Sequence, residues 1–381
     1  MRFGNATFDP EEAIKTDGDV RLTNCGYLKF LQRDLTPQLT GKSKRRLSSA
    51  VHPPIKVRTG TLNVFDSTKS GSYGHTPWHS CVSVGIDGVY RTAHAEDLRE
   101  THELVYKNDR PYHFREKSPL FDWSDDGLNV EFDHLYPCGV IIRVINTIRT
   151  PLSLKKVPMH KLRLLSNTMS PVILRGFADT LDEGIYIAKA PNWAKLYHAL
   201  PMHFDGIFKY EDQLELRTGK IARVQKPPGY QFFTCHAAAP KDDGVTLFAS
   251  SRLFFRYLPL PWTTDRLYRA KYSMDGDGYW TASPSNLPLV VTHPGTGLPR
   301  LRWHQPWDLS QTKFSTCKVS IDNEDSALAG EIDSLIYDYR VCLRLSWETG
   351  DVVVNDNISM LHTRTAYESN CDRELWRIHC D

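Results

Sequence analysis

Two short segments far apart in the sequence hold residue types that together can bind a metal ion. His203 and Asp205 lie two positions apart, and His362 follows about 160 residues later. Two histidines and one carboxylate can occupy one face of an iron ion, which leaves three positions open for a cosubstrate and oxygen. The residue types and their spacing therefore predict oxygen chemistry at an iron site.

A His-x-Asp triplet is weak evidence by itself, because a chain with 15 histidines contains about one such triplet by chance. This chain has a second one, His379-Cys380-Asp381, which no later histidine completes, and we interpret it as accidental. The first triplet differs in its context. Alternation places His203 and Asp205 on one face of an extended segment, where both side chains can reach one ion.

The segment that carries the distal histidine is predicted to be a pair of short strands. A turn at residues 348–351 precedes an apolar strand at 352–354 and a polar stretch at 355–357, and His362 lies in a further extended run, 361–367. Arg373 follows eleven positions after His362. Its planar guanidinium can donate two parallel hydrogen bonds to the far carboxylate of a dicarboxylic acid.

These segments resemble the TauD/TfdA (taurine dioxygenase-like) family of Fe(II)/2-oxoglutarate enzymes. The resemblance covers roughly residues 150–381. It rests on an opening Leu-Arg-Gly-Phe at 174–177, a strand at 227–233, the Asp-Gly-Val-Thr-Leu-Phe element at 243–248, and the signature Gly-Asp-x-x-x-x-Asp-Asn, Leu-His-x-Arg-x-Ala-Tyr and Arg-Glu-Leu-Trp-Arg between 350 and 377.

The resemblance implies a mainly β double-stranded β-helix, or jelly-roll, domain with Fe(II) as cofactor and 2-oxoglutarate as cosubstrate. It implies that Thr246 and Arg373 hold the distal carboxylate of 2-oxoglutarate. Arg377 has two open interpretations, a contact to a substrate carboxylate and an ion pair with an acid on the barrel surface. The implied metal ligands, which are also the catalytic residues, are His203, Asp205 and His362.

The first 148 residues resemble the C-terminal half of an isocyanide synthase of the pyoverdine/dityrosine-biosynthesis type, a family known to be fused to a TauD-like domain in fungi. The segments that carry this resemblance are 51–56, 75–82, 110–123 and 132–143. A complete synthase is longer at its N-terminus, so we expect an incomplete α/β domain at 1–148 that does not form isonitriles, followed by the dioxygenase domain at 149–381. The chain also looks shortened near 44–51 and between Gly184 and His203.

The charge and composition of the chain limit the kinds of partner that it can bind. The formal charge of +2, from 47 basic and 45 acidic residues, provides no general field for nucleic acid or membrane. The eight cysteines show no Cys-x-x-Cys spacing, no apolar run approaches 18 residues, and the N-terminus lacks the apolar core of a signal peptide. We therefore predict a cytoplasmic protein that binds a small-molecule substrate, without nucleic acid or membrane.

The sequence predicts an oxygenase that hydroxylates or desaturates a small-molecule secondary metabolite. Fusion to a synthase-like segment suggests an amino-acid-derived isonitrile as the substrate. The alternative is a catalytically inactive remnant of an isocyanide synthase–dioxygenase fusion, which the shortened regions motivate. Serine hydrolase, NTPase and dinucleotide-binding motifs are absent from the sequence, which argues against those classes.

Overall fold

The computed structural model of the chain describes residues 80–107, 110–145, 152–182, 201–206, 210–215, 220–240, 243–276, 284–306, 316–322, 327–367 and 372–380. The sequence segments singled out at 44–56 and 75–79, and most of the region between Gly184 and His203, lie outside these residues. The described residues form two compact units that divide between Asp122 and Trp123. No helix among them is both long and apolar enough to cross a membrane.

The first unit is a four-stranded sheet with the strand order β2-β1-β4-β3. Two antiparallel hairpins, β1 with β2 and β3 with β4, are joined by parallel pairing of β1 with β4. Leu98 and Phe114 are buried together in this unit. Its elements are β1 Ser80–Val84, β2 Tyr90–His94, α3 Ala95–Leu98, β3 His102–Lys107 and β4 Arg110–Glu116.

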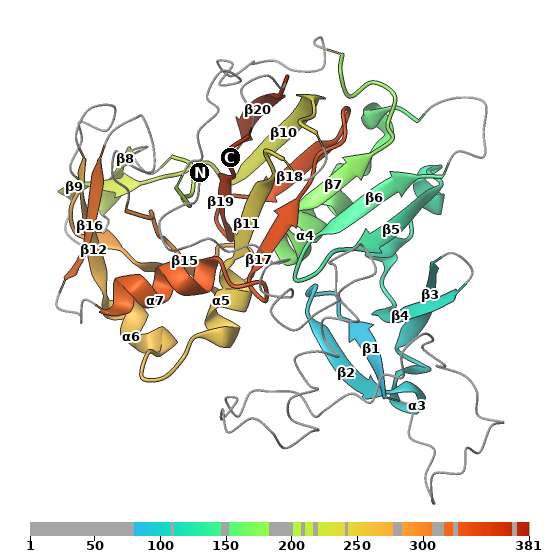
Figure 1. The fold of residues 1–381 in the computed structure, drawn as a ribbon, viewed down its shortest axis with the longest axis horizontal. Coiled ribbons are helices and arrows are strands. Elements are labelled where there is room, and N and C mark those ends of the chain that lie inside the picture. Colours follow the sequence, from blue (N-terminus) through green and yellow to red (C-terminus); the bar gives the residue numbers. More distant parts are fainter. Residues whose placement is uncertain are drawn as a thin grey trace, which may run out of the picture. The chain divides into compact units, whose positions relative to one another are not determined.

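The second unit is built on a six-stranded sheet with the order β20-β10-β18-β7-β6-β5. All neighbouring strands are antiparallel except β6 and β7. Figure 1 shows β10, β18 and β7 side by side in this sheet. The strands are β5 Val130–His134, β6 Val140–Val144, β7 Val172–Arg175, β10 Tyr230–Ala237, β18 Val352–Asp356 and β20 Glu374–Cys380.

A three-stranded sheet, β17-β11-β19, contributes to the same core as the large sheet. Phe233 and Val353 of the large sheet belong to one buried cluster with Leu247 and Leu343 of the small one. Two sheets that share one apolar core match the jelly-roll predicted from the sequence. The small sheet consists of β11 Thr246–Ser250, β17 Cys342–Leu345 and β19 Met360–Arg364.

Helices and short strands surround these two sheets. Helix α4, Met159–Met169, connects β6 to β7 and buries Leu162, Leu165 and Met169, which share one helical face, while it packs against β7 and β18. The remaining elements are α5 Ser251–Tyr257, α6 Thr264–Arg269, α7 Ala327–Ile336, β8 Tyr210–Glu215, β9 Lys220–Gln225, β12 Lys271–Gly276, β13 Leu287–Pro288, β14 Val290–Thr292, β15 Pro299–Leu301 and β16 Cys317–Asp322.

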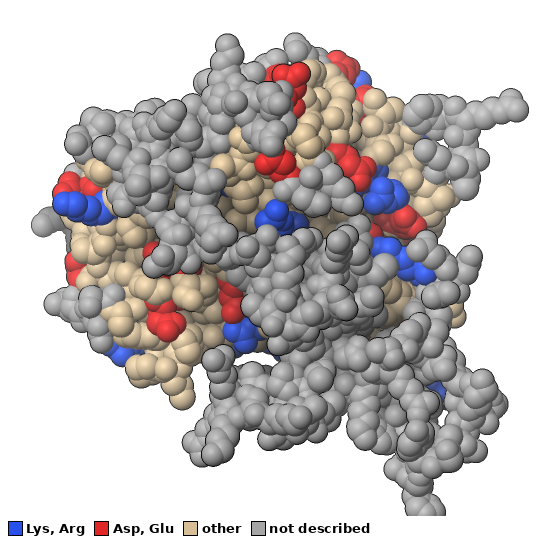
Figure 2. Space-filling view, viewed as in Figure 1, with Lys and Arg blue, Asp and Glu red and all other residues tan. Residues whose placement is uncertain are grey.

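The domain boundary predicted at 148/149 falls between β6 and β7, which are neighbours in one sheet. Strands β5 and β6, which that boundary assigns to the synthase-like segment, thus extend the sheet of the second unit. The incomplete α/β domain at 1–148 stays a prediction. On the face drawn in Figure 2, basic and acidic side chains of the described residues lie interspersed.

Arg175, from the Leu-Arg-Gly-Phe segment, ties β7 to the turn before β18. Its Nε and Nη2 donate to Asp351 Oδ1 and Oδ2 at 2.7 and 2.6 Å, and its Nη1 donates to Glu348 Oε1 at 2.5 Å. The Asp351 side chain is 1% exposed, whereas that of Glu348 is 60% exposed. The two acids therefore contact the same guanidinium in very different surroundings.

We expect the Asp351→Ala variant to lose about 3–5 kcal/mol of unfolding free energy, because it leaves the buried guanidinium of Arg175 without its bidentate partner. The matched control is Glu348→Ala, which removes an exposed partner of the same guanidinium and should cost less than about 1 kcal/mol. Urea denaturation of the two variants measures both values. Equal losses would contradict the assignment of the buried pair as the stabilising one.

Candidate metal centre

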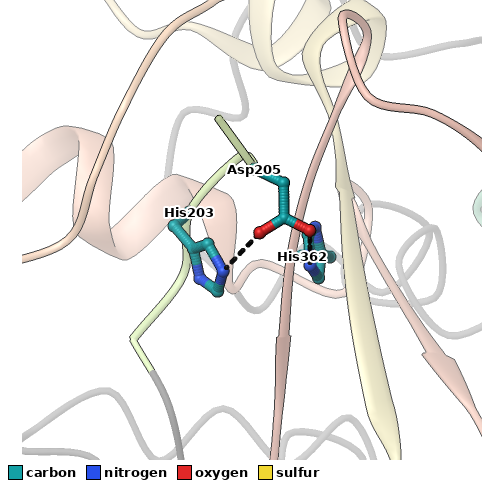
Figure 3. A group of neighbouring side chains, drawn as sticks. All are labelled: His203, Asp205 and His362. Carbon is teal, nitrogen blue, oxygen red and sulfur yellow. Dashed lines mark ion pairs between the residues drawn. The ribbon is translucent and has the colours of Figure 1, made fainter. Parts of the chain in front are cut away.

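The three predicted metal ligands meet at one place. His203, Asp205 and His362 each offer one ligand atom, and these atoms all lie within 4.8 Å of one another. The Nε2 atoms of His203 and His362 lie 3.5 and 3.8 Å from the two carboxylate oxygens of Asp205. Figure 3 shows the carboxylate between the two imidazole rings. The geometry is thus that of three donors around a common point.

The two histidines are joined through their main chains. His203 N donates to His362 O at 3.1 Å, and His362 N donates to His203 O at 2.7 Å, which makes an isolated antiparallel bridge. The segment that holds His203 therefore pairs with β19, where His362 lies opposite Phe248 of β11. The backbone alone brings the two rings to 4.7 Å between centroids.

Both imidazoles can present a lone pair to a cation. His203 Nδ1 lies 2.8 Å from Pro201 O. A proton on Nδ1 in that contact leaves the lone pair of Nε2 available to a metal ion. Burial lowers the pKa of His362 to about 3, so its ring is neutral at physiological pH. The ring packs against Phe233 and Phe248, with centroid distances of 5.7 and 6.3 Å.

Asp205 carries the negative charge of the centre. Burial alone would raise the pKa of Asp205, but its contacts with His203, His379 and His362 and the charge of Arg377 hold it well below its usual value. Its Oδ2 accepts hydrogen bonds from Gln231 Nε2, from Arg377 Nη1 at 2.6 Å and from His379 Nε2 at 3.1 Å. A carboxylate beside two imidazoles is a donor set that fits Fe(II) and leaves coordination positions open.

Thr246 and Arg373 contact each other, as the family resemblance implies for a 2-oxoglutarate site. Arg373 Nη2 donates to Thr246 Oγ1 at 3.3 Å, and its Nε donates to Gly244 O at 2.9 Å. The Arg373 side chain is 7% exposed, and burial, followed by the nearby Arg364, lowers its pKa to about 10. A buried guanidinium beside a hydroxyl is suited to hold a carboxylate.

The Thr246–Arg373 pair and the metal centre share one face of the small sheet. Thr246 is two positions from Phe248, so both side chains leave β11 on the same side. Phe248 is the cross-strand partner of His362. Trp347 Nε1 donates to Thr246 Oγ1 at 2.8 Å, and the Trp347 ring lies 6.4 Å from that of Phe233, which contacts His362. The two sites are therefore neighbours.

Arg377 pairs with an acid, but that acid is the predicted metal ligand Asp205 rather than a residue of the barrel surface. Its side chain is 29% exposed. His379, whose triplet we interpreted as accidental, contacts the same carboxylate oxygen. The signal that could have revealed this is the alternation along β20, which places Arg377 and His379 on one face. Gln231, Asn355 and Asn357 also surround Asp205, and sequence reasoning assigned them no role.

Two sheets around a shared core, with a His-x-Asp…His centre beside a buried Thr–Arg pair, form the arrangement of mononuclear non-haem iron oxygenases. Comparison with known proteins agrees. Residues 221–379 match the family described as "Taurine catabolism dioxygenase TauD, TfdA family". The chain thus carries a TauD/TfdA domain in its C-terminal part, which confirms the resemblance seen in the sequence.

Two curated relatives extend this result. The chain is 50% identical to the isocyanide synthase xanB of Aspergillus fumigatus over an alignment 439 residues long. The alignment covers 100% of this chain and 58% of the relative. It is 28% identical over 189 residues to the tyrosine isonitrile desaturase of Erwinia amylovora, which covers 47% of this chain and 58% of that enzyme. The chain thus spans less than two thirds of the relatives' length.

A solved structure supports the fold. The structure of PvcB, described as an Fe, alpha-ketoglutarate dependent oxygenase from an isonitrile synthetic pathway, aligns with a TM-score of 0.50 and 19% identity. The alignment covers 73% of this chain and 95% of PvcB. At this identity the likeness shows the fold, and it confirms the predicted mainly β, TauD-like architecture of the C-terminal part.

Proposed function

We propose that this chain is an Fe(II)- and 2-oxoglutarate-dependent oxygenase that acts on an amino-acid-derived isonitrile. The observation that carries the proposal is the convergence of His203, Asp205 and His362 within 4.8 Å, next to the buried Thr246–Arg373 pair. The TauD/TfdA match supports the class of reaction. The isonitrile enzymes among the relatives support the class of substrate.

His203, Asp205 and His362 would hold the iron. When bound, iron with 2-oxoglutarate and oxygen supplies an oxidant that removes hydrogen from a carbon–hydrogen bond, with succinate and carbon dioxide as coproducts. The chain's residues position and shield this chemistry. Arg373 would donate to the distal carboxylate of 2-oxoglutarate, and Thr246, whose Oγ1 accepts from Arg373 Nη2, would lie beside that carboxylate.

Apolar side chains limit the access of water to the His362 side of the centre. Phe233 and Phe248 are buried and pack against the His362 ring. Such an apolar surface strengthens the attraction between a charged ligand and a cation, because the local dielectric constant is lower than that of water. Neutral His362 remains unprotonated over the physiological range and can serve as a ligand without first losing a proton.

The outcome at the substrate would be hydroxylation or desaturation beside the isonitrile group. A substrate with a free carboxylate needs a cationic contact near the centre. Arg377 supplies a guanidinium there, because its Nη1 lies 2.6 Å from Asp205 Oδ2. We propose that Arg377 contacts the substrate carboxylate as well as Asp205, since a guanidinium has five donors and this ion pair uses one of them.

The test is incubation of the purified chain with Fe(II), 2-oxoglutarate, oxygen and the isonitrile derivatives of tyrosine, tryptophan, leucine and valine. We expect iron-dependent succinate formation that at least one isonitrile accelerates, with a product that has lost two hydrogens or gained one oxygen by mass spectrometry. Turnover of taurine-like sulfonates alone would overturn the substrate proposal. No succinate under any condition would favour the alternative, an inactive remnant.

The unit before Trp123 belongs to the same proposal. We propose that residues 1–148 are an incomplete isocyanide-synthase-like segment that does not form isonitriles. The isocyanide synthase relative, of which this chain spans 58%, supports the likeness of this segment to a synthase. Incubation of the chain with free amino acids should therefore yield no isonitrile.

A further inference from the structure

A series of amide side chains approaches the Asp205 carboxylate from the protein interior. Gln231 Nε2 donates to Asp205 Oδ2, and Asn355 Nδ2 donates to Gln231 Oε1 at 2.7 Å. Ser170 Oγ donates to Asn355 Oδ1 at 3.3 Å and accepts from Asp356 N at 2.8 Å. Gln231 and Asn355 are fully buried. We call Gln231, Asn355 and Ser170 the amide relay.

The direction of every hydrogen bond in the amide relay follows from the carboxylate. An ionised carboxylate only accepts, so Gln231 must present its NH₂ group to Asp205. Its carbonyl oxygen then faces Asn355, which must donate in turn, and the Asn355 oxygen is left to accept from Ser170. The backbone N–H of Asp356 closes the series at the far end. One orientation of each amide is therefore consistent with all four hydrogen bonds.

The pairing of two strands explains why these residues meet. Gln231 of β10 and Asn355 of β18 are directly opposite each other in the antiparallel register. Side chains of directly opposed residues on one face lie within contact distance. The amide relay is therefore built into the large sheet, which holds it rigidly beside the metal centre.

A second amide, that of Asn357, fixes the main chain of the same residue. Asp205 N donates to Asn357 Oδ1 at 2.9 Å, and Asn357 Nδ2 donates to Asp205 O at 2.9 Å and to Pro228 O at 2.9 Å. Asn357 is fully buried. Both polar backbone groups of Asp205 are thus bound by one side chain that lies about 150 residues away in the sequence.

The contacts of the Asp205 carboxylate are unequal on its two oxygens. Oδ2 accepts from Gln231, Arg377 and His379, and His362 Nε2 lies 3.8 Å from it. In the described part of the chain, Oδ1 has only His203 Nε2 nearby, at 3.5 Å. The amide relay ends on one oxygen of a metal ligand, which a role in packing alone does not require. The asymmetry leaves Oδ1 free to coordinate a cation together with His203.

We propose that Gln231, oriented by Asn355, and Asn357 are positioning residues for the metal ligand Asp205. They hold Oδ2 and the Asp205 backbone so that the carboxylate stays between the two imidazoles, with Oδ1 on the side of His203 and Oδ2 on the side of His362. The inference rests on the proposed function only in requiring a divalent cation at the triad. Partners that orient a ligating carboxylate typically change metal affinity by about 10–100-fold when they are removed.

The decisive variant is Gln231→Met in the full chain, which keeps the length of the side chain and removes its donor. We expect the dissociation constant for Mn(II), measured from free Mn(II) by electron paramagnetic resonance, to rise about 10–100-fold. The matched control is Asn167→Asp on α4, an amide outside the amide relay that bonds to Tyr230, and it should leave the constant within about twofold of wild type. A purely structural role would lower the melting temperature and spare the Mn(II) affinity of the folded protein.

A second variant covers the case in which Gln231→Met does not fold. Asn355→Asp keeps the side-chain shape but removes the donor to Gln231, so the Gln231 amide can no longer present its NH₂ group to Asp205 without leaving its own oxygen opposite another acceptor. It should weaken Mn(II) binding to a similar extent. Unchanged Mn(II) affinity in a folded Gln231→Met or Asn355→Asp protein would overturn the positioning role while leaving the proposed function intact. Absence of Mn(II) binding by the wild type would overturn both.

Discussion

We expect replacement of His362 by alanine to lower iron-dependent succinate formation from 2-oxoglutarate by more than about 100-fold, since loss of a ligand should exceed the effect of losing an outer partner. The reason is local. The ring is buried between Phe233 and Phe248, and neither phenylalanine can supply a replacement donor atom. The measurement is succinate formation together with bound iron in the purified variant.

The fold should survive the His362→Ala substitution, because the hydrogen bonds between positions 203 and 362 use backbone atoms. The control variant is His160→Ala on the exposed face of α4, which should retain wild-type turnover and iron content. A His362→Ala protein that still bound one iron per chain and formed succinate at the wild-type rate would remove the triad from the mechanism.

Replacement of Arg373 by alanine should raise the 2-oxoglutarate concentration needed for half-maximal succinate formation by about 100-fold or more. Hydrogen bonds to charged groups contribute about 1.5–3 kcal/mol each, and a guanidinium donates two of them to one carboxylate. The burial of Arg373 increases the effect, because the carboxylate loses its partner in a site that water does not reach freely. Maximal turnover at saturating 2-oxoglutarate should fall much less than this.

Two further variants sharpen the Arg373 prediction. Arg373→Lys should recover part of the affinity, since an ammonium group keeps the charge but not the planar pair of donors. Arg269→Ala, on the exposed side of α6, removes an arginine of the same unit away from the site and should change nothing. An unaltered 2-oxoglutarate requirement in Arg373→Ala would show that another cation holds the distal carboxylate.

The residues that lie next to each other in the sequence were the ones that sequence reasoning placed correctly. The spacing of His203 and Asp205, the apolar run at 352–354 and the Leu-Arg-Gly-Phe strand all depend on local alternation. The structure has strands at 352–356 and 172–175, and an isolated bridge at His203 that a turn at Asp205 follows. The contact of Thr246 with Arg373 came from the family resemblance, not from any local pattern.

What sequence reasoning missed depends on pairing between distant strands. The contact of Gln231 with Asn355 requires the antiparallel register of β10 and β18, and a shift of one strand by one residue would turn its side chain to the other face, away from its partner. The approach of Arg377 and His379 to Asp205 depends in the same way on β20 lying beside β10. The position of β6 beside β7 follows from a parallel crossover through α4. No local pattern in either strand predicts this pairing.

The backbone bridge between His203 and His362 makes the centre insensitive to insertions and deletions elsewhere. Two main-chain hydrogen bonds set the separation of the two histidines. The length of the loops between them does not change that separation. Doubling a flexible connection costs only about 0.6 kcal/mol. Loops between the core strands of this stretch can therefore change in length while the spacing of the two histidines stays the same.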